Sequence, residues 1–175
     1  MKRLFFLSFF AIALIISSCG DDEPGFTEDN LAGTWALVSS DGTSTTVTTT
    51  GGSSSTINTD IAILSSDFQL TFAQNPNTIN SQIGEFTIET TQTIDGGSAS
   101  SSTEVMTQFA DNDTSWEIIG DVLNLDYANG DQESYIIIEL NNSSLKLKQE
   151  TSVDVNFGGT LIETESETLS VFERQ

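Results

Sequence analysis

Apolar and polar side chains alternate along most of the chain that follows residue 30. The clearest example is Phe68-Gln69-Leu70-Thr71-Phe72, in which every second side chain is apolar. A period of two is typical of a β-strand with one buried face. Lys146 and Lys148 alternate with leucines in the same way, so both lysines should point outward. The pattern predicts an interior that contains Trp35, Leu37, Phe68, Leu70, Phe72, Phe86, Ile88, Leu123, Leu125, Leu145 and Leu147.

Short turns rich in glycine and asparagine separate these segments. Asn129-Gly130 gives the strongest signal, because both central positions of a tight hairpin turn favour a positive φ angle. The other turns are Gly51-Gly52, Gly96-Gly97, Gly120-Asp121, Asn141-Asn142 and Gly158-Gly159. Two segments are open to interpretation. The Ser/Thr-rich run from 43 to 59 is either strand or loop, and Ile61 to Leu64 could form a short helical turn.

Connections as short as these join antiparallel neighbours. A serial meander has two exposed edges unless it closes on itself, and closure removes them. We therefore expect residues 29–175 to form one all-β domain, an antiparallel up-and-down β-barrel of about eight to ten strands. An open sandwich is the alternative. A domain of about 150 residues can bury a sufficient core without a metal or a disulfide.

The first residues have the pattern of an export signal. Lys2 and Arg3 precede an apolar stretch from 4 to 16, in which Ser8 is the only polar residue. The stretch is too short to span a bilayer, which takes about 20 residues, but it matches the apolar region of a signal peptide. Ile16-Ser17-Ser18-Cys19 resembles the cleavage box of bacterial lipoproteins. The resemblance implies that residues 1–18 are removed and that Cys19 is acylated; an ordinary secretory peptide that ends in cysteine is the alternative.

An acidic linker follows the cysteine. Asp21-Asp22-Glu23 resembles the surface-export signal of Bacteroidota lipoproteins, although a solvated linker has the same composition. We expect residues 19–28 to connect the lipid anchor to the domain. The expected location is the outer membrane, with the domain on the cell surface or on the periplasmic face.

The charge of the chain is strongly negative. Loss of Lys2 and Arg3 with the signal peptide changes the formal net charge from −21 to −23, because residues 1–18 contain no acidic residue. The cations that remain are Lys146, Lys148 and Arg174, against 26 carboxylates. Such a charge repels nucleic acid and anionic lipid headgroups. Partners should be cationic, neutral or sugar-like, or should be held inside the barrel.

The sequence does not favour an enzyme. It has no histidine, and its one cysteine is assigned to the lipid anchor, which excludes Ser-His, Cys-His and histidine-based metal sites. The carboxylates form no distinctive pair, and we expect no cofactor. Asp111-Asn112-Asp113 with Glu117, and the segment from Asp126 to Glu133, contain oxygen ligands that calcium could use. Neither has calcium-hand spacing, so we interpret both as solvated turns without a metal.

Several short motifs, taken in order, resemble the lipocalin-like lipoproteins of Bacteroidota, which have a calycin-type barrel. Gly33-Thr34-Trp35 matches the Gly-x-Trp of the first strand, and Phe172-Glu173-Arg174 matches an aromatic-x-Arg ending. The segments from 116 to 125 and from 135 to 140 lie between them in the expected order. The resemblance implies a ligand in the mouth of the barrel and a terminal arginine stacked on the opening tryptophan, here Arg174 on Trp35. The cysteines of many animal lipocalins are absent.

The last strand gives candidate ligand-lining residues. Glu163, Glu165 and Glu167 share one face and should point to water, because burial of unpaired charges is costly. Thr164, Ser166 and Thr168 then point inward, and with Phe72 they are the candidates that line a partly polar cleft. Leu169 and Val171 fall on the glutamate face, which implies either a bulge or a covered outer surface.

Two functions are compatible with this picture. The first is a membrane-anchored, monomeric lipoprotein whose barrel binds a small neutral or amphipathic molecule, since no interior cation is available to pair with an anion. The second is a structural or accessory lipoprotein of an envelope complex without a small-molecule ligand. The interior distinguishes them: an empty cavity of roughly 300–1,000 Å³ favours the first function, and an interior filled by side chains favours the second.

Overall fold

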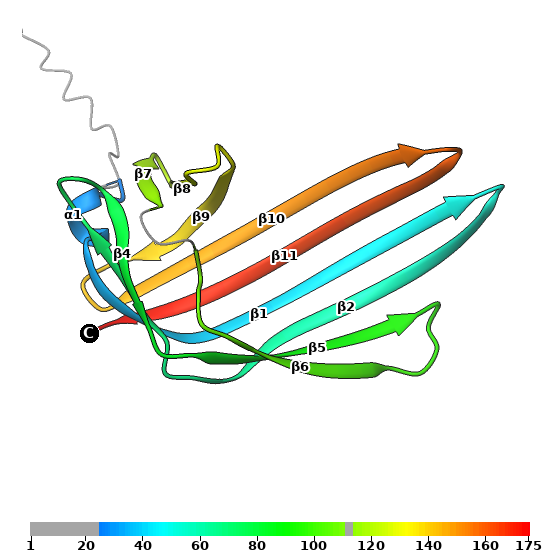
Figure 1. Ribbon diagram of the computed structural model, residues 1–175, viewed down its shortest axis with the longest axis horizontal. Helices are drawn as coiled ribbons and strands as arrows, with labels where there is room; N and C mark the ends of the chain where they lie inside the picture. The colour runs from blue at the N-terminus through cyan, green and yellow to red at the C-terminus, as the bar shows by residue number, and fades with distance from the viewer. Residues whose placement is uncertain (1–24, 111–113) are drawn as a thin grey trace, which may run out of the picture.

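The computed structural model describes residues 25–110 and 114–175, which form an all-β structure with one short helix (Figure 1). The elements are α1 (Glu28–Leu31), β1 (Gly33–Thr50), β2 (Ser53–Ser66), β3 (Gln69–Ala73), β4 (Thr78–Ile83), β5 (Phe86–Ile94), β6 (Ser100–Met106), β7 (Ser115–Ile119), β8 (Val122–Asp126), β9 (Gln132–Leu140), β10 (Ser144–Phe157) and β11 (Thr160–Arg174). The predicted all-β, antiparallel character is confirmed. The predicted signal peptide, residues 1–18, and Cys19 lie outside the described residues. No helix in the described part of the chain has the length and hydrophobicity needed to cross a membrane.

Eight of the eleven strands form a closed ring of antiparallel pairs. The order is β11-β10-β9-β8-β7-β4-β3-β1, and β1 pairs back onto β11. The strand pairing with the fewest paired residues in the ring is that of β4 with β7, where Thr78 lies opposite Ser115. There the backbone N–H of Ile79 donates to the carbonyl of Thr114 at 2.9 Å. The ring thus has one narrow seam.

The other three strands branch from the ring through β1, which is long enough to serve two neighbours on one side. Gly33 to Ala36 pair with β3, whereas Asp41 to Thr50 pair with β2. β5 and β6 then continue beyond β2. Strand order therefore departs from a serial meander, and the structure has eleven strands where we expected eight to ten.

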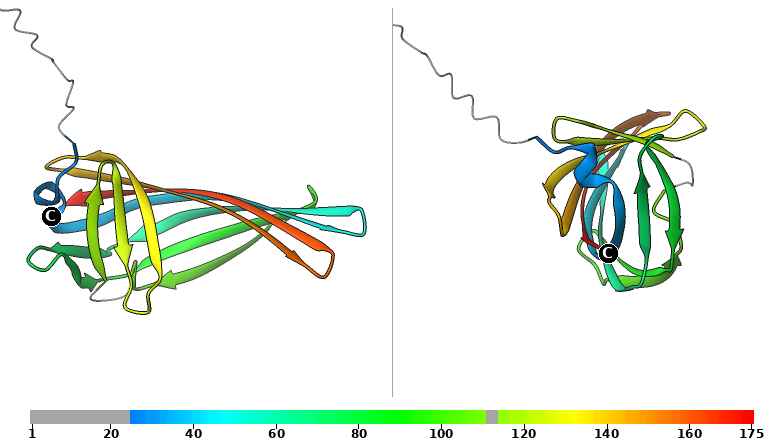
Figure 2. Two further views of the ribbon diagram at one scale, coloured as in Figure 1. Left: turned by 90° about the horizontal axis from the view of Figure 1, so that it is seen from above. Right: turned by 90° about the vertical axis from the view of Figure 1, so that its left-hand side faces the viewer.

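Beyond the ring, six strands continue as an open sheet in the order β10-β11-β1-β2-β5-β6. We call residues 41–66, 86–106 and 149–169 the distal sheet. Figure 1 and Figure 2 both show its β1–β2 and β10–β11 hairpins extending far from the ring. β1 and β11 stay paired as far as the tips of these hairpins, where Thr50 lies opposite Thr160. Both ambiguous segments are strand: the run from 43 to 59 forms the β1–β2 hairpin, and the helical turn expected at Ile61–Leu64 is wrong because these residues pair with β1 and β5.

Threonine hydroxyls explain why so polar a segment is extended. β-branched side chains favour strands, and opposed threonines can bond across a strand pair. The hydroxyl of Thr46 lies 3.1 Å from that of Thr164, and those of Thr50 and Thr160 lie 2.8 Å apart. Register here is held by hydroxyl pairs instead of by an apolar core.

The ring encloses the hydrophobic core. Of the eleven side chains predicted to face inward, ten are buried and Ile88 is half-buried against them. The rings of Phe72 and Trp116 meet edge to face with their centroids 5.8 Å apart, and Phe109 and Phe172 do so at 5.6 Å. The predicted register of the ring strands is therefore confirmed, including the outward position of Lys146 and Lys148, which form ion pairs at the surface.

The last strand keeps one register along its whole length against β10. Its buried side chains Ser170 and Phe172 share a face with Thr164, Ser166 and Thr168, while the three glutamates lie exposed on the other face. The register shift between β1 and β11 lies in β1, between Leu37 and Ser39. Leu169 consequently stands on the outer surface, where 39% of it is exposed.

Candidate functional site

The two ends of the domain meet at Trp35 and Arg174, which are paired residues of β1 and β11. The guanidinium carbon of Arg174 lies 4.3 Å from the centre of the Trp35 ring system, so the predicted stacking is present. Arg174 Nη1 donates to the carbonyl of Ala32 at 2.8 Å, and Nη2 donates to that of Asn30. Trp35 Nε1 donates to the carbonyl of Leu31 at 2.7 Å.

This arrangement is a helix cap. The last carbonyls of a helix lack partners within the helix, and here Trp35 and Arg174 supply donors for the end of α1. Gly33 leaves the room that the arginine needs, since a Cβ atom there would lie 2.5 Å from Arg174 Nη1. Trp35 and Arg174 lie at one end of the ring and hold the two ends of the domain together. Their side-chain hydrogen bonds are made to the backbone carbonyls of residues 30 to 32.

The predicted lining residues do not form one site. Phe72 is 1% exposed and lies opposite Gly33, whereas Thr164 lies opposite Thr46. The fourteen residues of β1 from Gly33 to Thr46 extend over about 40 Å. Thr164 bonds to Thr46, and Ser166 borders a groove of the distal sheet together with Glu165 and Glu167. The expected cleft that combined Phe72 with the hydroxyl residues is therefore not present as one cavity.

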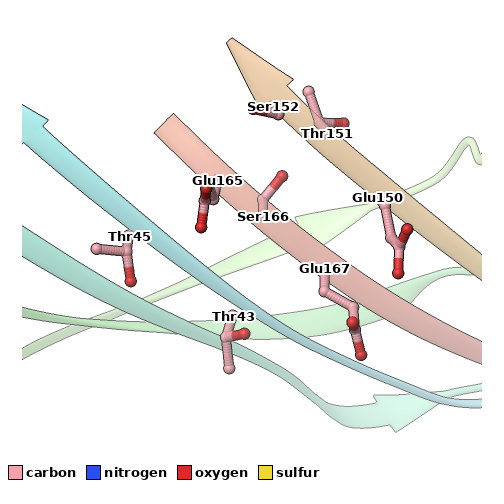
Figure 3. Close-up of a pocket in the computed structure, with 8 residues that line it drawn as sticks. All are labelled: Thr43, Thr45, Glu150, Thr151, Ser152, Glu165, Ser166 and Glu167. Atoms are coloured by element: carbon pink, nitrogen blue, oxygen red, sulfur yellow. The ribbon is translucent and has the colours of Figure 1, made fainter. Parts of the chain in front are cut away.

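A groove of the distal sheet lies instead over the glutamate face. It has a volume of about 530 Å³, and Glu165 and Glu167 of β11 lie between Thr43 and Thr45 of β1 and Glu150 of β10 (Figure 3). Two smaller grooves, of about 430 and 330 Å³, continue it along the same strands. All three are open depressions of one surface.

Strand register explains why carboxylates gather on this surface. Side chains directly opposite one another in an antiparallel sheet share a face. Glu167 lies opposite both Thr43 and Glu150, and Thr43 lies opposite Asp60. We call the resulting set the acidic face. Its carboxylates are Asp41, Asp60, Glu89, Glu150, Asp154, Glu163, Glu165 and Glu167.

One cation serves the acidic face. Lys148 Nζ lies 2.5 Å from a carboxylate oxygen of Glu150 and 2.9 Å from one of Glu167. Hydrogen bonds to Glu150 and then to Glu167 raise the pKa of Lys148 above its ordinary value. The other two cations of the described residues are engaged elsewhere, Lys146 with Glu139 and Arg174 at the helix cap. The acidic face thus retains a large excess of negative charge.

A second groove, also of about 530 Å³, lies beside Phe109, Tyr127 and Glu133. The hydroxyls of Tyr127 and Tyr135 both donate to one oxygen of Glu133, at 2.8 and 2.7 Å. Burial, followed by the hydrogen bond to Glu133, raises the pKa of Tyr135 above its ordinary value. Tyr135 therefore remains a neutral hydrogen-bond donor at physiological pH.

The calcium candidates do not gather ligands. Among the described residues no group of three or more acidic, cysteine or histidine side chains could hold a metal ion. In the segment from Asp126 to Glu133, Asn129 bonds to Asp131 and Gln132 bonds to Asp126, as in a hydrogen-bonded turn. Asp111–Asp113 lies outside the described residues, and Glu117 is an exposed residue of β7.

Comparisons with protein-family models, curated proteins and solved structures find no match to this chain. The site is therefore interpreted from its own geometry. Sequence reasoning placed the three glutamates of β11 on the outside but missed the acidic face. The alternation of Glu150, Ser152 and Asp154 was visible, yet only the register between strands unites these residues with those of β1 and β2.

Proposed function

We propose that the chain is a lipid-anchored envelope lipoprotein that acts as an accessory subunit, with the distal sheet as its interaction surface and the ring as its support. The observation that carries this proposal is the buried apolar core that the ring encloses. Trp35, Phe72 and Phe172 are at most 1% exposed, and leucine side chains from five strands belong to the same core as these aromatic side chains. An eight-stranded enclosure is just wide enough for side chains to fill or for one small ligand to occupy.

The lipocalin resemblance belongs to this proposal. The Gly-x-Trp and aromatic-x-Arg motifs lie side by side, as that family would place them, and support a lipocalin-like barrel whose interior is used for stability. A carrier of a small neutral or amphipathic molecule needs an interior that its ligand can enter. The grooves described above lie at the surface, and none of them is lined by Trp35, Leu70 or Leu125.

Native mass spectrometry of the mature protein, purified in mild detergent, tests the filled interior. We expect the mass of the acylated chain alone. A stoichiometric additional small molecule would contradict the proposal and favour the carrier function. Benzene binding is a second test of whether the interior of the ring is filled, because an apolar cavity left by a large-to-small substitution binds benzene. The Leu125→Ala variant should bind it, and the unmodified protein should not.

Crosslinking in cells tests the accessory role. A photoreactive amino acid at Ser152, on the distal sheet, should form an adduct of defined mass with an envelope protein. The matched position is Asn124, on the outer side of a ring strand, where we expect no adduct. Adducts from Asn124 alone would contradict the assignment of the distal sheet as the interaction surface.

A further inference from the structure

The distal part of β10 is a free sheet edge. β9 pairs with β10 through Leu145 to Lys148, and among the described residues β11 is the one strand that pairs with residues 149–157. These nine residues extend over about 30 Å. At such an edge every second residue presents its N–H and C=O away from the sheet, which is a template for another strand.

The two faces of this edge have opposite chemical character. Val153, Val155 and Phe157 share one face and are 46%, 47% and 82% exposed. Glu150 and Asp154 point to the other, the acidic face, with Glu163 and Glu165 on the adjacent strand. A strand that fits both faces alternates apolar with cationic side chains. The free edge of β6 lacks this combination, because Ser100 to Thr103 are all small and polar.

The structure contains an example of the required charge contact. Lys148, at the start of the free edge, reaches a glutamate of its own strand and one of β11 at the same time. In the described part of the chain, no lysine or arginine pairs with Asp154, Glu163 or Glu165 farther along. Cations on an added strand would complete a row that Lys148 begins.

A second copy of the chain is a poor occupant of this edge. Antiparallel pairing of two β10 edges about Ser152 would place Glu150 of each copy opposite Asp154 of the other. Like charges directly opposite one another destabilise a strand pair, and each mature chain has a formal net charge of −23, two below that of the whole sequence. The acidic side chains therefore protect the edge from self-association.

We infer that the free edge of β10, from Gln149 to Phe157, accepts an extended segment of a partner protein in which cationic and apolar side chains alternate, as an added strand of the distal sheet. This inference rests on the proposed function and names its partner's chemistry. Main-chain hydrogen bonds would supply affinity, and the two faces would supply specificity, as in other cases of strand addition.

The test uses a nine-residue peptide of alternating lysine and valine and the purified, full-length mature protein. Binding is measured by calorimetry, and the site is located by amide hydrogen exchange. We expect saturable binding with protection confined to residues 149–157. Two matched peptides carry N-methyl groups on the backbone amides of every second residue. One peptide is methylated at the odd positions and the other at the even positions. The register that blocks the edge-facing amides should abolish binding, and the other should bind like the parent peptide.

Protein variants test the charge pattern without a change in the edge backbone. Asp154→Asn combined with Glu165→Gln should weaken binding about three- to tenfold, since cross-strand pairs contribute modestly. The matched control, Glu104→Gln combined with Glu117→Gln, removes the same charge outside the acidic face and should leave affinity unchanged. Equal weakening by both double variants, equal binding of a scrambled peptide, protection at β6, or no binding would each overturn the inference.

Failure here is distinguishable from failure of the proposed function. A ligand found inside the ring would contradict the accessory role whatever the peptide does. An empty ring together with a peptide that does not bind would leave the accessory role in place and remove strand addition. A concentration-dependent dimer that the peptide dissociates would show that the edge pairs with a second copy and would overturn the choice of a basic partner.

Discussion

Removal of the Arg174 side chain should destabilise the domain far more than removal of another surface cation. Arg174 stacks on Trp35 at 4.3 Å and donates to two carbonyls at the end of α1. The stacking contributes about 1 kcal/mol. The bond to Ala32, which is partly buried, contributes about 1.5 kcal/mol, and the exposed bond to Asn30 adds little because water can replace it. The Arg174→Ala variant should therefore lose about 2.5 kcal/mol of unfolding free energy.

Urea denaturation measures this loss. With a slope of about 2 kcal/mol per molar urea, the midpoint should fall by about 1 M. The transition should be followed by circular dichroism and not by tryptophan fluorescence, because removal of Arg174 changes the environment of Trp35 directly. The matched control is Lys146→Ala, which breaks the exposed ion pair with Glu139, and such pairs contribute about 0–1 kcal/mol.

The conservative variant separates charge from geometry. Lysine keeps the positive charge of Arg174 but lacks the planar group that stacks and donates in two directions. Arg174→Lys should therefore lose about half as much stability as Arg174→Ala. If Arg174→Ala and Lys146→Ala shift the midpoint equally, or if Arg174→Lys behaves like the unmodified protein, the helix-cap argument is wrong.

Three further predictions concern the anchor, the core and pH. Cys19→Ala should abolish acylation and move the protein from the membrane to the soluble fraction; retention by membranes would contradict the anchor. Leu125→Ala should cost about 2–5 kcal/mol in urea denaturation, because this side chain is fully buried in the ring. Tyr135 keeps its proton in the folded state at a pH where the unfolded chain loses it, since its folded pKa is raised. Stability should therefore be insensitive to this group at neutral pH and fall as pH rises above about 10. Tyr135→Phe should reduce that alkaline loss, and an unchanged pH profile would refute the assignment.

Alternation was a reliable guide wherever a strand has one buried face. Leu70 and Phe72 are fixed on the inside by their period of two, because a shift of one residue would expose both. The same reasoning placed Glu165 outside and Ser166 inside on β11. These features depend on neighbouring residues in the chain, so they could be predicted from the sequence.

The branch at β1 could not be predicted in this way. Nothing local distinguishes a strand that ends with the ring from one that continues beyond it, as β1 does from Asp41 to Thr50. The Ser/Thr composition of this part fits either a strand or a loop, and the choice depends on partners such as Thr164 that are distant in sequence. The acidic face has the same origin, since it unites carboxylates from several strands.

The length of β1 has a mechanical consequence. Its eighteen residues extend over about 60 Å, from the end of the ring where Trp35 meets Arg174 to the tip of its hairpin. Under the proposed function, a pull between the amino-terminal side of the domain and a partner on the distal sheet would be directed along the strands, and the paired lengths of β1, β11 and β10 would be loaded in shear. In shear the hydrogen bonds of a ladder share the force, whereas in peeling they break one after another. The fold is thus suited to carry tension between an anchored end and a distant attachment.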